Sequence, residues 1–159
     1  MKRALLSLMT AAFVVGLTAA APVKAADEKA AAPKWTENYA AALAQAKKEK
    51  KMLLLDFTGS DWCGYCIKLH DAVFSKPEFA KWSTRFVLVE LDYPHKKQLS
   101  AEIKKQNSEL KTKYKIQGFP TIIILDADEK KLAEAVGYGG DAVADWTAAR
   151  DAEIAKSKK

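Results

Sequence analysis

The hydrophobic residues of this chain gather in short continuous runs, separated by segments with helical spacing. Three runs rich in Leu, Val and Ile, at residues 52–57, 86–91 and 121–125, predict buried strands. Residues 131–136 follow a polar turn at 126–129 and predict a further strand at the edge of the sheet. Because helical segments lie between the first strands and a hairpin closes the sheet, the pattern predicts an α/β fold with a mixed sheet flanked by helices.

Apolar residues spaced every four positions predict the first helix. Trp35, Tyr39 and Leu43 recur at this spacing, with Thr36 as the expected N-cap residue. Further helices are expected at residues 63–75, from Pro77 onward, at 96–114 and after Asp141. The helix at 96–114 is expected to carry Leu99, Ile103, Gln106 and Leu110 on one face.

The N-terminal residues have the pattern of a secretory signal peptide. Lys2 and Arg3 precede an apolar, uncharged stretch at residues 4–19, and small residues suited to cleavage follow it. Export, to a bacterial periplasm, is therefore expected, with an uncleaved membrane anchor as the alternative. The expected organisation is a signal peptide at 1–25, a flexible leader at 26–34 and one domain at 35–156.

The positive charge of the chain does not indicate a nucleic-acid partner. The formal net charge of +6 falls to +3 when Lys2, Arg3 and Lys24 leave with the signal peptide. Lysine pairs such as 96–97 and 104–105 fall on expected helices or helix ends, and are interpreted as solvated faces. Nucleic-acid binding needs a basic surface with exposed aromatic residues, and export argues further against it.

The only two cysteines, Cys63 and Cys66, lie just after the first buried strand and open the expected helix at 63–75. A cysteine at a helix start faces unpaired backbone N–H groups and the positive end of the helix dipole. Both favour the thiolate, which is the nucleophilic form. The spacing places the two sulfurs on one helix face, near enough to form a disulfide. The pair therefore indicates thiol–disulfide exchange.

Other uses of two cysteines fit less well. A disulfide that closes so short a loop constrains the unfolded chain little, which argues against a structural role. A structural zinc site needs four ligands, usually as two paired motifs, and this chain has only one such pair. His70 and His95 are both expected at the surface. Covalent haem attachment requires His directly after the second cysteine, and Ile67 stands there. We therefore expect no metal and no cofactor.

The residues around the dithiol resemble the thioredoxin-like superfamily. Asp56 to Cys66 is similar to the strand, aromatic residue and dithiol of that active site, and residues 114–121 resemble the segment with the family's cis-proline. Gly137 resembles the glycine before the final helix. The resemblance covers residues 35–155 and extends to the C-terminal domain of the bacterial transmembrane disulfide reductase. It implies a thioredoxin-like fold, with the helix at 96–114 as an insertion before the cis-proline segment.

The chain departs from the family pattern at three positions. Tyr65 stands between the cysteines where the family often has proline, as in exported disulfide isomerases. Asp56 lies one residue further from the dithiol than the family's buried acid, so a bulge of one residue is expected. Glu90 lies about where the family often has a lysine.

The resemblance implies an enzyme, a thiol–disulfide oxidoreductase whose direction of electron flow stays open. Cys63 is the expected exposed nucleophile, Cys66 the resolving thiol and Asp56 the acceptor of its proton. Residues expected to contact a substrate are Trp62, Gly64, Tyr65, Phe119, Pro120 (after a cis bond) and Thr121. The implied partners of this monomer are exported proteins with cysteines and a redox donor or acceptor protein. The alternative is a non-catalytic thioredoxin-fold binding or chaperone module.

Overall fold

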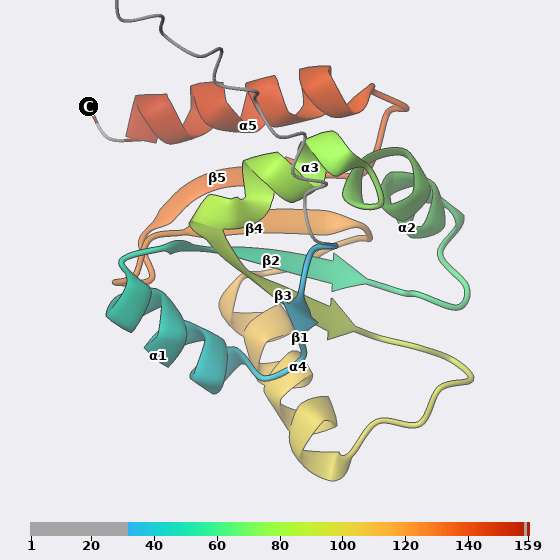
Figure 1. Ribbon diagram of the computed structural model, residues 1–159. Helices are drawn as coiled ribbons and strands as arrows, with labels where there is room; N and C mark the ends of the chain where they lie inside the picture. The colour runs from blue at the N-terminus through green and yellow to red at the C-terminus, as the bar shows by residue number, and fades with distance from the viewer. Residues whose placement is uncertain (1–31, 158) are drawn as a thin grey trace, which may run out of the picture.

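A mixed β-sheet forms the centre of the computed structural model, which describes residues 32–157 and residue 159 (Figure 1). Five strands of this part of the chain lie in the order β1-β3-β2-β4-β5. The first three run parallel, whereas β4 and β5 are antiparallel to their neighbours. Their bounds are β1 Trp35–Thr36, β2 Met52–Thr58, β3 Phe86–Asp92, β4 Thr121–Leu125 and β5 Lys131–Val136. β2, β3 and β4 confirm the prediction from the apolar runs, and β5 confirms the strand expected after the polar turn.

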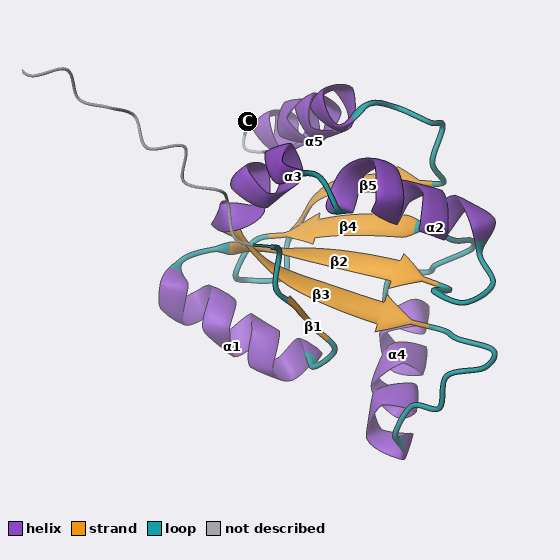
Figure 2. Cartoon of the chain, turned by 45° about the vertical axis from the view of Figure 1, so that its right-hand side comes forward, coloured by secondary structure: helices purple, strands orange, loops and turns teal. Residues whose placement is uncertain are grey.

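Helices cover both faces of the sheet, which gives three layers (Figure 2). Tyr39 and Ala46 of α1 and Leu110 of α4 pack on one face, whereas Phe79 of α3 and Trp146 of α5 pack on the other. Alternate residues of the central strand supply both cores, as strand geometry requires. The helices are α1 Tyr39–Glu49, α2 Gly64–Leu69, the π-helical turn η1 His70–Phe74, α3 Pro77–Trp82, the 3-10 turn η2 Ser83–Arg85, α4 Ala101–Lys113 and α5 Val143–Ser157.

The prediction for the first helix is wrong at its start. Trp35 lies in β1, paired with Leu88, and not on the helix. Its ring packs against Phe74 and Phe79 on the face opposite to α1. The N-cap residue is Asn38, whose side chain accepts the Ala41 backbone N–H at 2.9 Å. The four-residue spacing therefore placed the start of the predicted helix too early. Residues 35–36 form a strand because they pair with β3, and this partner is not visible in the local sequence.

The helix expected at 96–114 is shorter than predicted. It begins at Ala101, after Ser100, whose hydroxyl caps it by accepting the Ile103 backbone N–H. Leu99 therefore lies before the helix, and Asn107 and Leu110 are its buried residues. The physical reason lies in residues 95–97, whose backbone N–H groups all donate to the Asp61 carboxylate and not to a helix. The signal peptide and most of the leader lie outside the described residues.

Candidate active site

The two cysteines lie where β2 ends and α2 begins. Cys63 is the N-cap residue of α2, and its sulfur accepts the backbone N–H of Cys66 at 3.2 Å. The two residues form a disulfide, with their Cα atoms 5.3 Å apart. Upstream, the Cys63 backbone N–H donates to the carbonyl of Gly59 at 2.8 Å, which closes the turn between β2 and α2. The first cysteine thus takes the capping position, where the Cys66 backbone N–H points at its sulfur.

The expectation that Cys63 is exposed is wrong for this disulfide form. Cys63 is 6% exposed and Cys66 is 5% exposed, so the two differ little. The covalent bond to Cys66 and the hydrogen bond from its N–H cover the Cys63 sulfur. Accessibility alone therefore does not distinguish the two sulfurs, and the capping position does.

The segment that precedes β4 lies beside the dithiol segment, at the end of the sheet where β2 ends and β4 begins (Figure 2). Thr121 pairs with Phe57 of β2, and the Phe119–Pro120 peptide bond before it is cis. The Phe119 ring packs edge-on against Trp62, with ring centroids 5.9 Å apart. Pro120 accepts the Gly137 backbone N–H through its carbonyl at 2.8 Å. Within residues 32–157 and 159, the backbone N–H and carbonyl of Phe119 have no hydrogen-bond partner.

Exposed apolar side chains surround this end of the sheet, and we call them the apolar rim. Trp62, Tyr65 and Ile67 come from the dithiol segment and are 43%, 61% and 44% exposed. Val136, at 67%, ends β5 opposite Thr121. No other large hydrophobic residue in the described part of the chain is exposed. Exposed apolar groups gathered in one place are typical of an interaction site.

Besides Phe119, three further neighbours hold Trp62 in the rim. Its ring stacks on His95 at 4.6 Å between centroids, and its indole N–H donates to the Tyr93 carbonyl at 2.8 Å. Its other neighbour is Gly59, since a Cβ built on this glycine would lie 2.5 Å from the Trp62 ring. These contacts fix the orientation of the Trp62 ring, which is predicted to face the substrate.

Gly59→Ala is expected to displace the Trp62 ring and to lower the free energy of unfolding by about 1–3 kcal/mol, the usual effect of overpacking. Urea unfolding, followed by tryptophan fluorescence, measures the change. Gly139→Ala is the matched control, because no atom lies within 4 Å of a Cβ at Gly139. Equal stability of the two alanine variants would contradict the packing role of Gly59.

A cavity of about 280 Å³ opens beside Cys66, on the inner side of the dithiol. Asp56 of β2, Glu90 of β3 and His70 of η1 line it together with Cys66. Asp56 pairs with Glu90 in the β2–β3 register, so the two carboxylates lie on adjacent strands. The structure therefore brings the predicted acid Asp56 and the predicted resolving thiol to one cavity.

Asp56 has little solvent and no neutralising partner. It is 8% exposed, and its Oδ1 has no hydrogen-bond partner among the described residues. Burial raises the pKa of the Asp56 carboxyl well above its ordinary value, and the charges of Glu90 and Asp92 raise it further. The pKa of Glu90 is also raised, first by its burial and then by Asp92. A carboxyl in this setting holds its proton more tightly than a solvated one.

Residues 39–145 match the family described as the thioredoxin-like domain. The chain belongs to the thioredoxin-like family. This confirms the fold expected from the dithiol and the cis-proline segment.

Two relatives from Chlamydia pneumoniae resemble this thioredoxin-like chain. The first, described as disulfide bond reductase DsbH, is 42% identical over 98 residues, which are 61% of this chain and 59% of the relative. The second, thioredoxin-related protein DsbJ, is 35% identical over 108 residues, 67% of this chain and 31% of the relative. The chain thus aligns with less than two thirds of the length of either relative.

Solved structures show the same fold. The structure described as DsbH oxidoreductase superposes with a TM-score of 0.74 at 33% identity, and covers 89% of this chain and 94% of its own. The oxidised C-terminal domain of Neisseria meningitidis DsbD superposes with a TM-score of 0.54 at 18% identity, covering 72% of this chain and 90% of its own. At that identity the second match supports the fold alone.

The strand that carries Asp56 is regular in this thioredoxin-like domain. β2 pairs with β3 in an unbroken register from Met52 to Thr58, and its pairing with β4 is also regular. The bulge expected near Asp56 is therefore absent from β2. Residues 59–62, which follow β2, connect it to the Cys63 N-cap.

Three residues of this site were not predicted as site residues. Ile67 and Val136 belong to the apolar rim, and Glu90 lies opposite Asp56. Ile67 and Val136 could have been found from the sequence as apolar residues on the solvent side of the helix or strand that carries them. Gly64, in contrast, is exposed as a substrate-facing residue requires, and no atom lies within 4 Å of a Cβ built on it.

Two kinds of feature are absent from residues 32–157 and 159. No group of three or more His, Cys, Asp or Glu side chains there is arranged to hold a metal ion. None of the helices in that part of the chain is long and apolar enough to cross a membrane.

Proposed function

We propose that this chain is an exported thiol–disulfide oxidoreductase that exchanges its Cys63–Cys66 disulfide with cysteines of substrate proteins. The observation that carries the proposal is the Cys63 sulfur at the N-cap of α2, bonded to Cys66 and facing the backbone N–H of that residue. This position favours a thiolate after reduction, because the helix N-terminus stabilises negative charge. Similarity to a chain described as a disulfide bond reductase favours the reductive direction.

In that direction, the Cys63 thiolate attacks one sulfur of a substrate disulfide. A bond forms between Cys63 and this sulfur, and the other substrate sulfur leaves as a thiolate. The apolar rim contacts the apolar side chains beside the substrate cysteine. The unpaired backbone groups of Phe119 bind the extended substrate segment by adding it to the sheet edge. Pro120 and Thr121 hold that backbone through their contacts with Gly137 and Gly118.

Cys66 then resolves the mixed disulfide. Its thiol loses a proton and attacks the Cys63 sulfur, so the second substrate sulfur leaves as a thiolate. The substrate has gained two electrons, and the chain is left with its own disulfide. Asp56, which shares a cavity with Cys66, is positioned to accept the proton. A donor thiol protein returns the dithiol to the reduced form.

The remaining parts of the proposal rest on the sequence. Residues 1–25 direct export and 26–34 form a leader, so that residues 35–156 work as a monomeric domain outside the cytoplasm. N-terminal sequencing of the protein from a periplasmic extract tests the cleavage site. The partners are then exported proteins with cysteines and the donor protein, with no nucleic acid.

The test of the function is catalysed reduction of insulin disulfides by dithiothreitol. The wild-type protein is expected to accelerate the reaction, whereas Cys63→Ala/Cys66→Ala is expected to leave it at the uncatalysed rate. Circular dichroism shows whether the double variant stays folded, as its intact core predicts. A wild-type protein that binds unfolded insulin chains without faster reduction would instead support the binding or chaperone alternative.

A further inference from the structure

A groove of about 500 Å³ lies next to the apolar rim, between the loop at residues 93–100 and helix α4. Its lining carries three lysines, Lys97, Lys104 and Lys111, together with His95 and Tyr93. We call it the basic groove. The prediction that the lysines at 97 and 104 lie on plain solvated faces is therefore incomplete, because they line a concave surface.

The positive charge of the basic groove is only partly neutralised. Lys97 pairs with Glu37 at 2.7 Å. Lys104 and Lys111 have no carboxylate within ion-pair distance in the part of the chain that the structure describes. The only acidic residue in the lining is Asp92, which is buried and accepts hydrogen bonds from Ser60. A ligand in this groove therefore meets uncompensated ammonium groups.

The basic groove is continuous with the proposed substrate face. Tyr93 packs on Phe119 with ring centroids 5.0 Å apart, and Trp62 stacks on His95. The Lys111 ammonium lies over both the Tyr93 and Phe119 rings, at 5.4 and 5.2 Å from their centroids. A peptide that lies across Trp62 and Phe119 thus leads from the dithiol directly into the groove.

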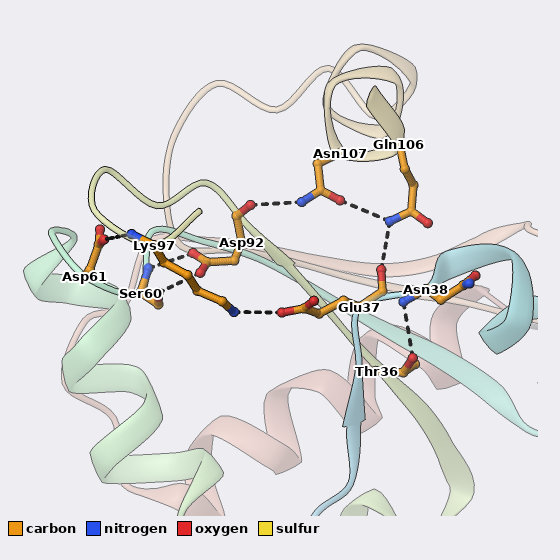
Figure 3. A network of polar contacts seen from close by, with 9 residues as sticks. All are labelled: Thr36, Glu37, Asn38, Ser60, Asp61, Asp92, Lys97, Gln106 and Asn107. Atoms are coloured by element: carbon orange, nitrogen blue, oxygen red, sulfur yellow. Dashed lines mark hydrogen bonds and ion pairs between the residues drawn. The ribbon is translucent and has the colours of Figure 1, made fainter. Parts of the chain in front are cut away.

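The loop that forms one wall of the groove is fixed to the dithiol segment (Figure 3). The Asp61 carboxylate accepts the backbone N–H groups of residues 95, 96 and 97 at 2.9, 2.6 and 3.2 Å. One residue earlier, Ser60 donates to the buried Asp92 carboxylate through its N–H at 2.9 Å and its hydroxyl at 2.6 Å. The wall is therefore built before any ligand arrives.

Helix α4, the other wall, is fixed by two neighbouring amides (Figure 3). Asn107 donates to the Asp92 carbonyl at 2.9 Å, and Gln106 donates to the Glu37 carbonyl at 2.8 Å. Gln106 also accepts the Tyr39 backbone N–H at 2.9 Å. Both walls are thus positioned relative to the rim, so binding in the groove requires little reorganisation.

We propose that the basic groove binds acidic side chains in the peptide segment beside the substrate cysteine, so that the protein selects substrates with Asp or Glu near the reactive disulfide. The inference rests on the proposed function and names its substrate class. Lysine ammonium groups attract the carboxylates of an acidic segment. This attraction speeds the encounter and fixes the register of the bound segment. Carboxylates reach Lys104 and Lys111, while the cysteine stays at the rim.

The test uses peptides of one length whose single cysteine carries a 2-thiopyridyl group, flanked by Asp and Glu, by Asn and Gln, or by Lys and Arg. The rate constant of their reaction with the reduced protein is followed by thiopyridone release. The acidic peptide is expected to react about three- to tenfold faster than the amide peptide, as a few partly exposed ion pairs provide. The preference is expected to shrink as salt screens the charges.

Two double variants, each of which removes two positive charges, distinguish an effect of the groove from an effect of the net charge. Lys104→Gln/Lys111→Gln is expected to lose the acidic preference, whereas Lys48→Gln/Lys156→Gln, with exposed lysines on α1 and α5, is expected to keep it. The uncharged disulfide 2,2′-dithiodipyridine is expected to react equally with the wild type and with Lys48→Gln/Lys156→Gln, and for the groove variant the readout is the ratio of its rates with the acidic and the amide peptide. No acidic preference in the wild type, or equal loss in both variants, would overturn the groove proposal.

Binding without chemistry keeps this test independent of the proposed function. The acidic peptide with Ser in place of Cys is titrated against the disulfide form of the protein, and the change in tryptophan fluorescence reports its binding. Tighter binding by the wild type than by Lys104→Gln/Lys111→Gln supports the groove even when no exchange occurs. If dithiodipyridine fails to react while the serine peptide binds, the oxidoreductase proposal fails and the groove stands. If the serine peptide does not bind, the groove proposal fails.

Discussion

Cys63→Ser is expected to reduce disulfide exchange with substrates to the uncatalysed rate, whereas Cys66→Ser is expected to attack substrates and stay bound to them. The reason is the position of Cys63 as the N-cap residue of α2, where its sulfur faces the Cys66 backbone N–H. Cys66 lies one turn further along the helix and faces the cavity with Asp56. Removing it deletes the thiol that would release the substrate.

The measurement is the fraction of each variant in mixed disulfides, read from non-reducing gels after acid quenching of cells. Cys66→Ser is expected to yield discrete adducts with exported proteins, and Cys63→Ser almost none. Alkylation of the single remaining thiol in each purified variant, followed over pH, provides the control for reactivity. Equal alkylation rates for Cys63 and Cys66, or adducts formed equally by both variants, would contradict the assigned roles.

The three central strands of the sheet were predictable because they are buried on both faces. β2, β3 and β4 read as continuous runs of Leu, Val and Ile, and almost all of their residues are buried in the structure. Such runs leave little choice of secondary structure. The order of the strands and the two helical layers follow from the thioredoxin-like pattern of helices between strands, and not from any single residue.

The errors lie where a distant residue decides the local conformation. Trp35 has helical spacing with Tyr39, but strand pairing with β3 and aromatic packing on α3 place it in β1. The start of α4 depends on Asp61, a residue far away in the sequence that takes the N–H groups of residues 95–97. Propensity and spacing carry no information about such partners.

In the functional site, too, the local features could be predicted and the long-range ones could not. The spacing of Cys63 and Cys66 after a buried strand indicated the dithiol, because this chemistry is local. The pairing of Asp56 with Glu90 depends on the register between β2 and β3, which no local pattern specifies. The basic groove likewise depends on how a loop and a helix pack. Two carboxylates beside one thiol are therefore a feature that only the folded structure brings together.

Asp56→Asn is expected to raise the stability of the fold and to slow the resolving step, two opposite effects from one substitution. Burial, then Glu90 and Asp92, raise the pKa of Asp56 above its value in the unfolded chain. The folded state therefore binds this proton more tightly than the unfolded state, and the resulting stability is lost as pH rises through the raised pKa. Asparagine carries no charge to bury. The free energy of unfolding of the Asp56→Asn variant should therefore exceed that of the wild type at alkaline pH.

The second effect follows from the shared cavity. If the proton of Cys66 passes to Asp56, asparagine cannot accept it, and release of the substrate thiol should slow by about ten- to a hundredfold. Urea unfolding of the disulfide form at a series of pH values measures the stability without titrating a thiol. Stopped-flow release of the second substrate thiol measures the resolving rate.

Two further variants separate this role from a general loss of charge. Glu90→Gln removes one of the charges that raise the pKa of Asp56 and is therefore expected to lower that pKa. The loss of stability with rising pH should therefore be smaller and end at lower pH, and the rise of the resolving rate should begin at lower pH. Asp128→Asn, an exposed acid in the turn between β4 and β5, should change neither property. A resolving rate unaffected by Asp56→Asn, or a pH profile unmoved by Glu90→Gln, would show that Cys66 loses its proton directly to water.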